Sequence, residues 1–207
     1  MSGSARNFGL GGIFVLVLAI VACAVPAGKA GTAANSDAVG LLRGGDFDGA
    51  DAGAWAESSA GGFPIVNGPS RLPFAAHSGG DAAWLGGYAN ADDTLAQDVT
   101  VPAGATGLAL AFFLRVRTEH GPRAAAVDLL QVTLEDGHGT VLREVASFSN
   151  RDALEAWIAR RYEMTDVPSL AGKTVRVVFH GSTDPVALTS FFVDTASFTA
   201  NVPPAGS

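Results

Sequence analysis

Apolar and polar residues alternate along much of the chain with a period of two, which is typical of a strand with one buried face. In the clearest run every second residue is apolar: Leu108, Leu110, Phe112, Leu114 and Val116. The same alternation recurs in residues 130–134 and 175–179, and residues 192–198 predict a further strand. The chain is therefore expected to be built from half-buried strands.

Shorter strands are predicted between these runs, over residues 39–42, 54–57, 63–66, 82–88, 94–101 and 157–162. Asp136-Gly137-His138-Gly139 predicts a hairpin turn, and residues 151–155 predict one helical turn capped by Asn150. Many short strands separated by Gly and Pro predict an all-β fold, a two-layer antiparallel β-sandwich. We expect this domain over residues 38–199, after a linker at 31–37 and before a disordered tail at 200–207.

Residues 1–30 have the features of an export leader, with Arg6 before a long uncharged apolar run. Three endings remain open. Gly28-Lys29-Ala30 fits conventional cleavage, Ile20-Val21-Ala22-Cys23 fits a lipobox in which Cys23 is lipidated, and the uncleaved run is long enough to remain as an anchor. Each ending places residues 31–207 outside the cytoplasm, either extracellular or in the cell envelope, with membrane contact only through the leader or a lipid.

Charge and cysteine content restrict the function classes. The net charge is −7 and the basic residues form no stripe, which argues against a nucleic-acid partner. The single cysteine, Cys23, lies in the leader, so the folded part has no disulfide, thiolate nucleophile or cysteine zinc site. No G-x-S-x-G or H-E-x-x-H motif occurs, and the four histidines are far apart in sequence. We therefore expect no catalytic residues and no enzyme activity.

Two aspartates fall on predicted apolar faces. Strand parity places Asp194 with Phe192, Ala196 and Phe198, and places Asp128 in line with residues 130–134. A buried carboxylate costs several kcal/mol unless it is partnered. Its partner could be a cation, an arginine or backbone N–H groups. Calcium is the natural cation, because it takes carboxylate and backbone oxygens in loose geometry.

Several segments together resemble a known module. The opening residues 41–49, with Gly44-Gly45-Asp46-Phe47-Asp48, resemble the "N-G-D-F-E" strand of galactose-binding-like jelly rolls. Residues 55–65, 76–80, 83–88, 91–95 and 171–176 and the closing 190–194 also fit a bacterial subgroup. Over residues 38–199 the chain is similar to MAM-like and carbohydrate-binding-module-like domains that follow the catalytic domain of secreted peptidases. The resemblance implies a jelly roll whose first and last strands are adjacent.

The resemblance also implies a structural calcium between those two strands. Its ligands would include Asp48 of the opening motif and Asp194 of the closing one, and Asp128 is a further candidate from its parity. This chain departs from the pattern where Gly44 replaces Asn, Asp48 replaces Glu and Thr195 replaces a second aspartate.

The predicted function is a non-catalytic binding or adhesion module whose partner is a glycan or an extracellular protein surface. Aromatic side chains stack well on sugar faces, and they are also the commonest fillers of a core. The candidates are Trp84, Tyr88 and Trp55, followed by Trp157 and Tyr162. A small extracellular hydrolase on a jelly-roll scaffold and a structural envelope protein without a discrete ligand are the alternatives. A row of exposed aromatics favours the first function, and a cleft with a histidine beside an acid favours a hydrolase.

Overall fold

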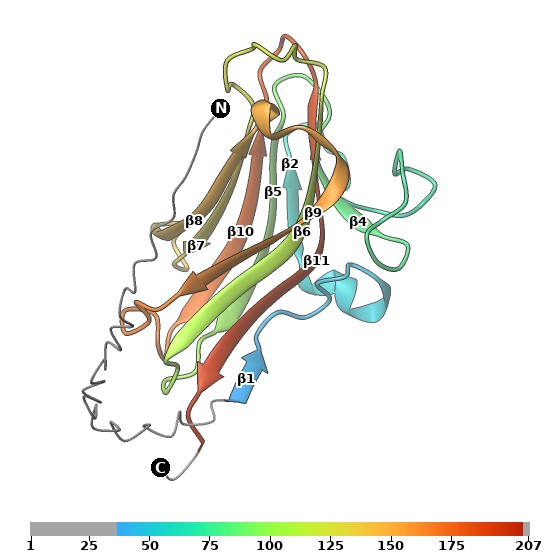
Figure 1. Cartoon of the computed structure of the whole chain (residues 1–207). Helices are drawn as coiled ribbons and strands as arrows, with labels where there is room; N and C mark the ends of the chain where they lie inside the picture. The colour runs from blue at the N-terminus through green and yellow to red at the C-terminus, as the bar shows by residue number, and fades with distance from the viewer. Residues whose placement is uncertain (1–36, 205–207) are drawn as a thin grey trace, which may run out of the picture. The chain divides into compact units, whose positions relative to one another are not determined.

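The alternating segments form two antiparallel sheets that pack face to face as a jelly roll (Figure 1). A computed structural model describes residues 37–204. The predicted leader with Cys23 and its three endings lies outside the described residues, as do most of the predicted linker and residues 205–207. Within residues 37–204, no helix has the length and apolar character needed to cross a membrane.

The first sheet has six strands in the order β3-β4-β11-β6-β9, with β1 paired to β11. Its strands are β1 (Asp37–Gly40), β3 (Val66–Asn67), β4 (Ala82–Gly86), β6 (Gly107–Thr118), β9 (Leu154–Met164) and β11 (Thr189–Val202). The predicted adjacency of the first and last strands is confirmed, because Asp37 pairs with Val202 and Gly40 with Thr199.

The second sheet has five strands in the order β2-β5-β10-β7-β8. Its strands are β2 (Ala56–Ser59), β5 (Asp92–Thr100), β7 (Leu129–Glu135), β8 (Val141–Ser149) and β10 (Thr174–Ser182). The predicted hairpin turn joins β7 to β8, where Glu135 pairs with Val141. The Asp136 carboxylate accepts from the backbone N–H groups of His138 and Thr140, which lowers the pKa of Asp136.

The core lies between the sheets and contains the residues that the alternation selected. Leu108, Leu110, Phe112, Leu114 and Val116 are at most 2% exposed, as β6 presents every second side chain to the opposite sheet. The corresponding residues of β7 and β10 are equally buried. The period-two pattern therefore predicted both the strands and their core faces.

The structure differs from the prediction at the C-terminal end, at one turn and at the predicted strand 63–66, where only Val66 lies in a strand, β3. β11 extends to Val202, beyond the predicted domain end at residue 199 and into the predicted tail, because Asn201 pairs with Gly107. The predicted helical turn is a 3-10 turn, η2 (Asn150–Asp152), and its cap is Ser149 rather than Asn150. A second 3-10 turn, η1 (Gly49–Ala54), follows the opening motif.

The predicted parity of β11 is wrong in one respect. Phe191 and Val193 face the central core, whereas Phe192 packs on the outer face of the sheet with Leu72 and Ala82. A β-bulge between Asp194 and Ser197, with Thr195 at φ +51°, then reverses the alternation, so Ala196 and Phe198 return to the core. Asp194 is buried as predicted, but on the outer face, beneath the loop that joins β3 to β4.

Candidate functional site

A hollow of about 380 Å³ lies between the loop after β2 and the end of β4. We call it the aromatic hollow. Its lining residues are Phe63, Pro64, Asn67, Arg71, Trp84, Gly86, Gly87, Tyr88 and Asp93. The volume lies within the range of about 300–1,000 Å³ that is usual for small-molecule pockets. Two of the three aromatic residues predicted to bind a ligand, Trp84 and Tyr88, are thus brought together.

Tyr88 is held in place by a buried carboxylate. Its hydroxyl donates to Asp93 Oδ1 over 2.6 Å and accepts from the backbone N–H of Gly61 over 3.0 Å. Asp93 is 1% exposed, and its second oxygen accepts from the backbone N–H of Gly86 over 2.8 Å. Asp93 therefore serves to fix the Tyr88 ring and the end of β4, and both of its oxygens are occupied.

Phe63 forms the exposed rim of the hollow. Its ring is 56% exposed and packs edge-on against the Tyr88 ring, with centroids 5.1 Å apart. Gly61 permits this position, since a Cβ there would come within 2.6 Å of the Phe63 ring. Sequence reasoning missed Phe63 because a lone Phe in a strand-like segment is expected in the core. Its place between Gly62 and Pro64 was the only signal of a loop.

Trp84 forms a wall of the aromatic hollow and also lines a second hollow of about 220 Å³, which is bordered by Thr118, Glu119 and Leu188. The indole packs against Phe192, with centroids 5.2 Å apart. Among the described residues its N–H has no acceptor. Gly87, at φ +81°, lies beside this N–H, and a Cβ there would come within 2.7 Å of Nε1.

The other aromatic candidates do not reach the hollow. Trp55 is 6% exposed and packs in the core between Phe47 and Phe179, with its Nε1 donating to the carbonyl of Gly44 over 2.8 Å. Its ring is not accessible to a ligand, so Trp55 is a core residue, which was the alternative role for these aromatic candidates. Trp157 packs on Phe74 at a different site.

Asp48 binds the loop between β3 and β4 through backbone N–H groups. Its Oδ1 accepts from Gly80 over 3.0 Å and from Asp81 over 3.1 Å. The 3-10 turn η1 begins directly after it, but the Asp48 side chain makes no cap bond to that turn. The carboxylate predicted to bind calcium therefore holds this loop against the end of the opening motif.

Asp194 binds the preceding residues of the same loop. It is fully buried, and it accepts from the backbone N–H of Ser78 over 2.9 Å and from that of Thr195. Burial raises the pKa of Asp194, and these backbone donors oppose the shift. His77 stacks on Phe113 and its Nδ1 lies 2.8 Å from Thr195 Oγ1, which fastens the loop to the bulge of β11.

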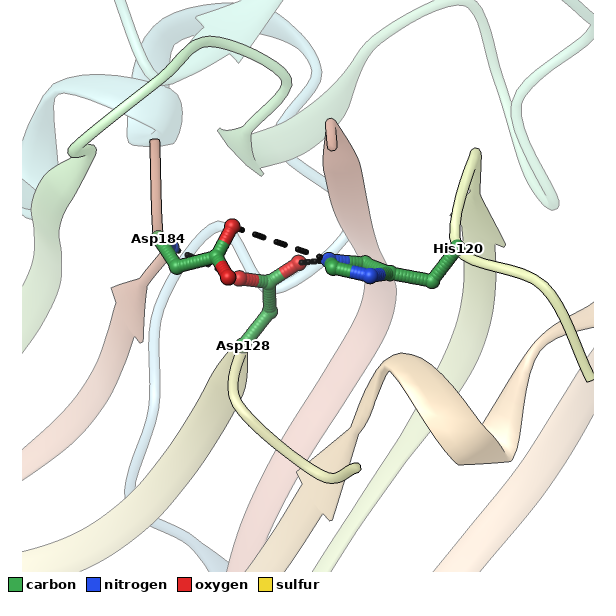
Figure 2. Close-up of side chains that lie close together, drawn as sticks. All are labelled: His120, Asp128 and Asp184. Carbon is green, nitrogen blue, oxygen red and sulfur yellow. Dashed lines mark hydrogen bonds and ion pairs between the residues drawn. The ribbon is translucent and has the colours of Figure 1, made fainter. Parts of the chain in front are cut away.

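Asp128 lies with other partners, at the end of the sandwich where β6 and β10 end and β7 begins (Figure 2). His120 Nε2 is 3.0 Å from Asp128 Oδ2 and 3.7 Å from Asp184 Oδ1. We call these three residues the end cluster. Within residues 37–204 they are the one group of three His, Cys, Asp or Glu side chains whose ligand atoms all lie within 4.8 Å.

The end cluster groups one predicted metal ligand, Asp128, with two residues that were not predicted. Sequence reasoning selected Asp128 but treated the histidines as dispersed, and so missed His120 and Asp184. The three residues lie on separate segments of the chain, and only the folded sheets bring these segments together. No short-range sequence signal could have revealed the group.

Comparison with known proteins agrees with the fold. No protein-family model matches the chain, and no curated protein matches it. Among solved structures, the carbohydrate-binding module TmCBM61 in complex with β-1,4-galactotriose is 14% identical, with a TM-score of 0.52, and the match covers 77% of this chain and 97% of that one. An apo-form cyclase from Fischerella sp. is 14% identical, with a TM-score of 0.52, and the match covers 81% and 98%.

An adhesin domain of Lys-gingipain from Porphyromonas gingivalis W83 is 16% identical, with a TM-score of 0.49, and the match covers 78% of this chain and 98% of that one. The two antiparallel sheets and the match to TmCBM61 confirm the predicted all-β, two-layer sandwich. The neighbours include both binding domains and an enzyme, so the likeness concerns the fold alone.

Proposed function

We propose that the chain is an exported, non-catalytic binding module and that the aromatic hollow binds a glycan. The observation that carries the proposal is the exposed Phe63 ring at the rim of a hollow that also contains Tyr88 and Trp84. A Phe that is more than half exposed loses the stabilisation of burial, and a hollow that gathers three aromatic residues is the usual form of a small-ligand site.

The chemistry of the lining suits a sugar. Aromatic faces pack against the C–H faces of sugar rings, and a few polar groups fix the orientation. Asp93 is occupied by Tyr88 and Gly86, so the polar contacts would come from Arg71 and Asn67, which also line the hollow. The neighbouring TmCBM61 structure holds a galactotriose, which makes galactose-containing oligosaccharides the first class to test.

A glycan-array screen of the purified protein, followed by calorimetry on the best ligand, tests the proposal. Phe63→Ala should weaken binding by at least about tenfold, which is about 1.4 kcal/mol. Leu154→Ala is the control, because Leu154 is similarly exposed, at 51%, on β9. Absence of any glycan ligand, or equal affinity in the two variants, would contradict the proposal and favour a structural envelope role.

The absence of catalysis is part of the proposal. Within residues 37–204 a histidine beside two acids, an arrangement that favours a hydrolase, occurs at the end cluster, but His120 and Asp128 are at least nine-tenths buried and line neither hollow described above. Prolonged incubation with the bound glycans should leave them intact by mass spectrometry. Cleavage that a His120→Gln change abolishes would establish the hydrolase instead.

We also propose the structural calcium between Asp48 and Asp194 that the galactose-binding-like motif implies. Both carboxylates hold the same loop, over residues 78–81, so a shared ion would strengthen an existing attachment. Calcium at a hundred times its Kd should raise the melting temperature by roughly 5–10 °C relative to chelator. Asp194→Asn should remove this rise. Identical melting curves with and without calcium would leave the backbone donors as the only partners.

The proposal has two further parts. The protein is exported, and it is a MAM-like module of the kind that follows the catalytic domain of secreted peptidases. The leader predicts that the protein is found outside the cytoplasm. If the lipobox operates, a palmitate analogue should label the protein and a Cys23→Ala change should abolish the labelling. Export without labelling would select conventional cleavage or a retained anchor, and a cytoplasmic location would refute the export prediction.

A further inference from the structure

We infer that the end cluster is a binding site for one divalent transition-metal ion of the zinc class, with His120, Asp128 and Asp184 as its ligands. This site is separate from the calcium site proposed above, and it does not depend on the glycan. Its two carboxylates and one imidazole come from the loop after β6, the residue before β7 and the loop after β10 (Figure 2).

The spacing of the ligand atoms fits one ion. Zinc binds nitrogen and oxygen ligands at about 2.0–2.2 Å, so two ligands of a tetrahedral ion lie about 3.3–3.6 Å apart. The distances from His120 Nε2 to Asp128 Oδ2 and Asp184 Oδ1, 3.0 and 3.7 Å, fall on either side of this value. Small side-chain rotations would therefore equalise them around an ion.

The buried atoms of the cluster have no other partner. Among the described residues, neither His120 Nε2 nor Asp128 Oδ2 makes a hydrogen bond, although they lie 3.0 Å apart. The side chains are 9% and 0% exposed. An unpaired buried carboxylate is costly, and the three side chains of the end cluster point toward one another (Figure 2). A cation between them would satisfy both atoms.

The charge balance also favours a cation. Asp128 and Asp184 bring two carboxylates together, and within residues 37–204 no lysine or arginine makes an ion pair with either of them. A protonated His120 would compensate only one negative charge. A divalent ion compensates both and leaves the imidazole neutral, as a ligand must be.

Surrounding hydrogen bonds orient the two carboxylates of the end cluster. Asp128 Oδ1 accepts from the backbone N–H of Asp184 over 2.7 Å, which leaves Oδ2 for an ion. Asp184 Oδ1 accepts from the backbone N–H of Val186 over 2.8 Å. The carboxylate of Asp184 is 24% exposed, which provides a route for entry and room for a water as fourth ligand.

The donor set selects the metal class. Calcium and magnesium take oxygen ligands, whereas imidazole is a ligand of zinc and other transition metals. One nitrogen and two carboxylates with an accessible fourth position therefore suit zinc better than calcium. This difference separates the end cluster from the oxygen-only pair of Asp48 and Asp194.

The site would stabilise the loop that carries Tyr88. Thr183 Oγ1 donates to the carbonyl of Tyr88 over 2.7 Å, and the backbone N–H of Asn90 donates to the carbonyl of Asp184 over 3.1 Å. An ion bound by Asp184 would thus fix the position of residues 183–184, to which the Tyr88 loop is hydrogen-bonded. This connection joins the metal site to the wall of the aromatic hollow.

The test uses the purified full-length protein and zinc chloride as the probe. Titration calorimetry after treatment with a chelator should give one site per chain, and saturating zinc should raise the melting temperature by roughly 5–10 °C. Calcium at the same concentration should give no rise that depends on His120. Cobalt(II) should give a visible spectrum that indicates nitrogen and oxygen ligands.

Matched variants decide which residues bind. His120→Gln, Asp128→Asn and Asp184→Asn should each weaken zinc binding at least tenfold and abolish the cobalt spectrum. The control is His180→Gln, because His180 Nε2 also lies 2.8 Å from an aspartate, Asp92, but this pair is exposed and no third His, Cys, Asp or Glu among the described residues joins it. The control should bind zinc as the original protein does.

Two results would overturn the inference. If zinc leaves the melting temperature and the heat of titration unchanged, the cluster is an ion pair only. If zinc binding survives His120→Gln, the ion lies elsewhere. Melting curves of each variant in chelator show that it folds. Zinc binding without any glycan ligand would refute the proposed function and leave the metal site in place.

Discussion

Asp194 within β11 and Asp128 directly before β7 are both fully buried, yet their carboxylates have different surroundings. Asp194 lies on the outer face of the first sheet and accepts from the backbone N–H groups of Ser78 and Thr195. Asp128 lies at the end of the sandwich with one oxygen satisfied by Asp184 and the other facing His120 without a hydrogen bond. Burial alone therefore does not identify a metal ligand. At the end cluster, the further observation that supports the inferred ion is a buried oxygen left without a donor.

The largest expected effect is that of removing the Asp194 carboxylate. Asp194→Ala leaves the backbone N–H groups of Ser78 and Thr195 without their acceptor, and each such loss costs about 1–3 kcal/mol. The free energy of unfolding in urea should fall by about 3 kcal/mol. Asp166→Ala, at an exposed site, is the control and should change little. A loss below about 1 kcal/mol would show that the loop attachment does not depend on Asp194.

A smaller effect is expected where Asp48 contacts the same loop. Gly79 has φ +55°, and a Cβ there would overlap Asp48 Oδ2. Gly79→Ala should therefore destabilise the fold by about 2 kcal/mol, through backbone strain and displacement of the carboxylate. Gly137→Ala is the control, because a Cβ at Gly137 meets no atom within 4 Å. Equal stability of the two variants in thermal melts would contradict this role of Gly79.

Asp128→Asn sharpens the comparison, because its expected effect in chelator is small. The amide keeps the acceptor for the Asp184 N–H and can donate to a neutral His120, so stability should change by less than about 1 kcal/mol. If His120 and Asp128 instead form a charged buried pair, the loss should be about 3–5 kcal/mol. Melting curves in chelator at neutral pH distinguish the two outcomes.

The smallest effect concerns an exposed pair on the second sheet. Arg176 donates to Asp98 over 2.8 Å, and this bond lowers the pKa of Asp98. A carboxyl group whose pKa is lower in the folded than in the unfolded protein contributes stability at pH values above its unfolded-state pKa. This contribution is lost as the pH falls through the folded-state pKa. Because both side chains are about half exposed, Arg176→Gln should cost at most about 0.5 kcal/mol at neutral pH. This loss of unfolding free energy should decrease in high salt and at acidic pH, as measured by urea denaturation. A larger loss at acidic pH than at neutral pH would contradict the predicted role of the pair.

Prediction from sequence succeeded where local periodicity carries the information. The strands at residues 108–116 and 175–179 were recognised with their core faces, because a strand repeats every two residues and the buried set is apolar. It failed at Asp194, since a bulge at Thr195 reverses the alternation and the sequence there gives no sign of it. Trp84 and Tyr88 were each selected as candidate ligand-binding residues, whereas Phe63 was not.

The sequence by itself determined the β-sandwich and the burial of Asp128, and its resemblance to jelly rolls implied the adjacency of the first and last strands. These depend on apolar spacing and on short motifs, which are properties of neighbouring residues. Only the tertiary structure decided which partners each carboxylate meets and that His120 lies beside Asp128 and Asp184. The physical reason is that these contacts join residues that are distant along the chain, and the register and bulges of the paired strands set their separation in space.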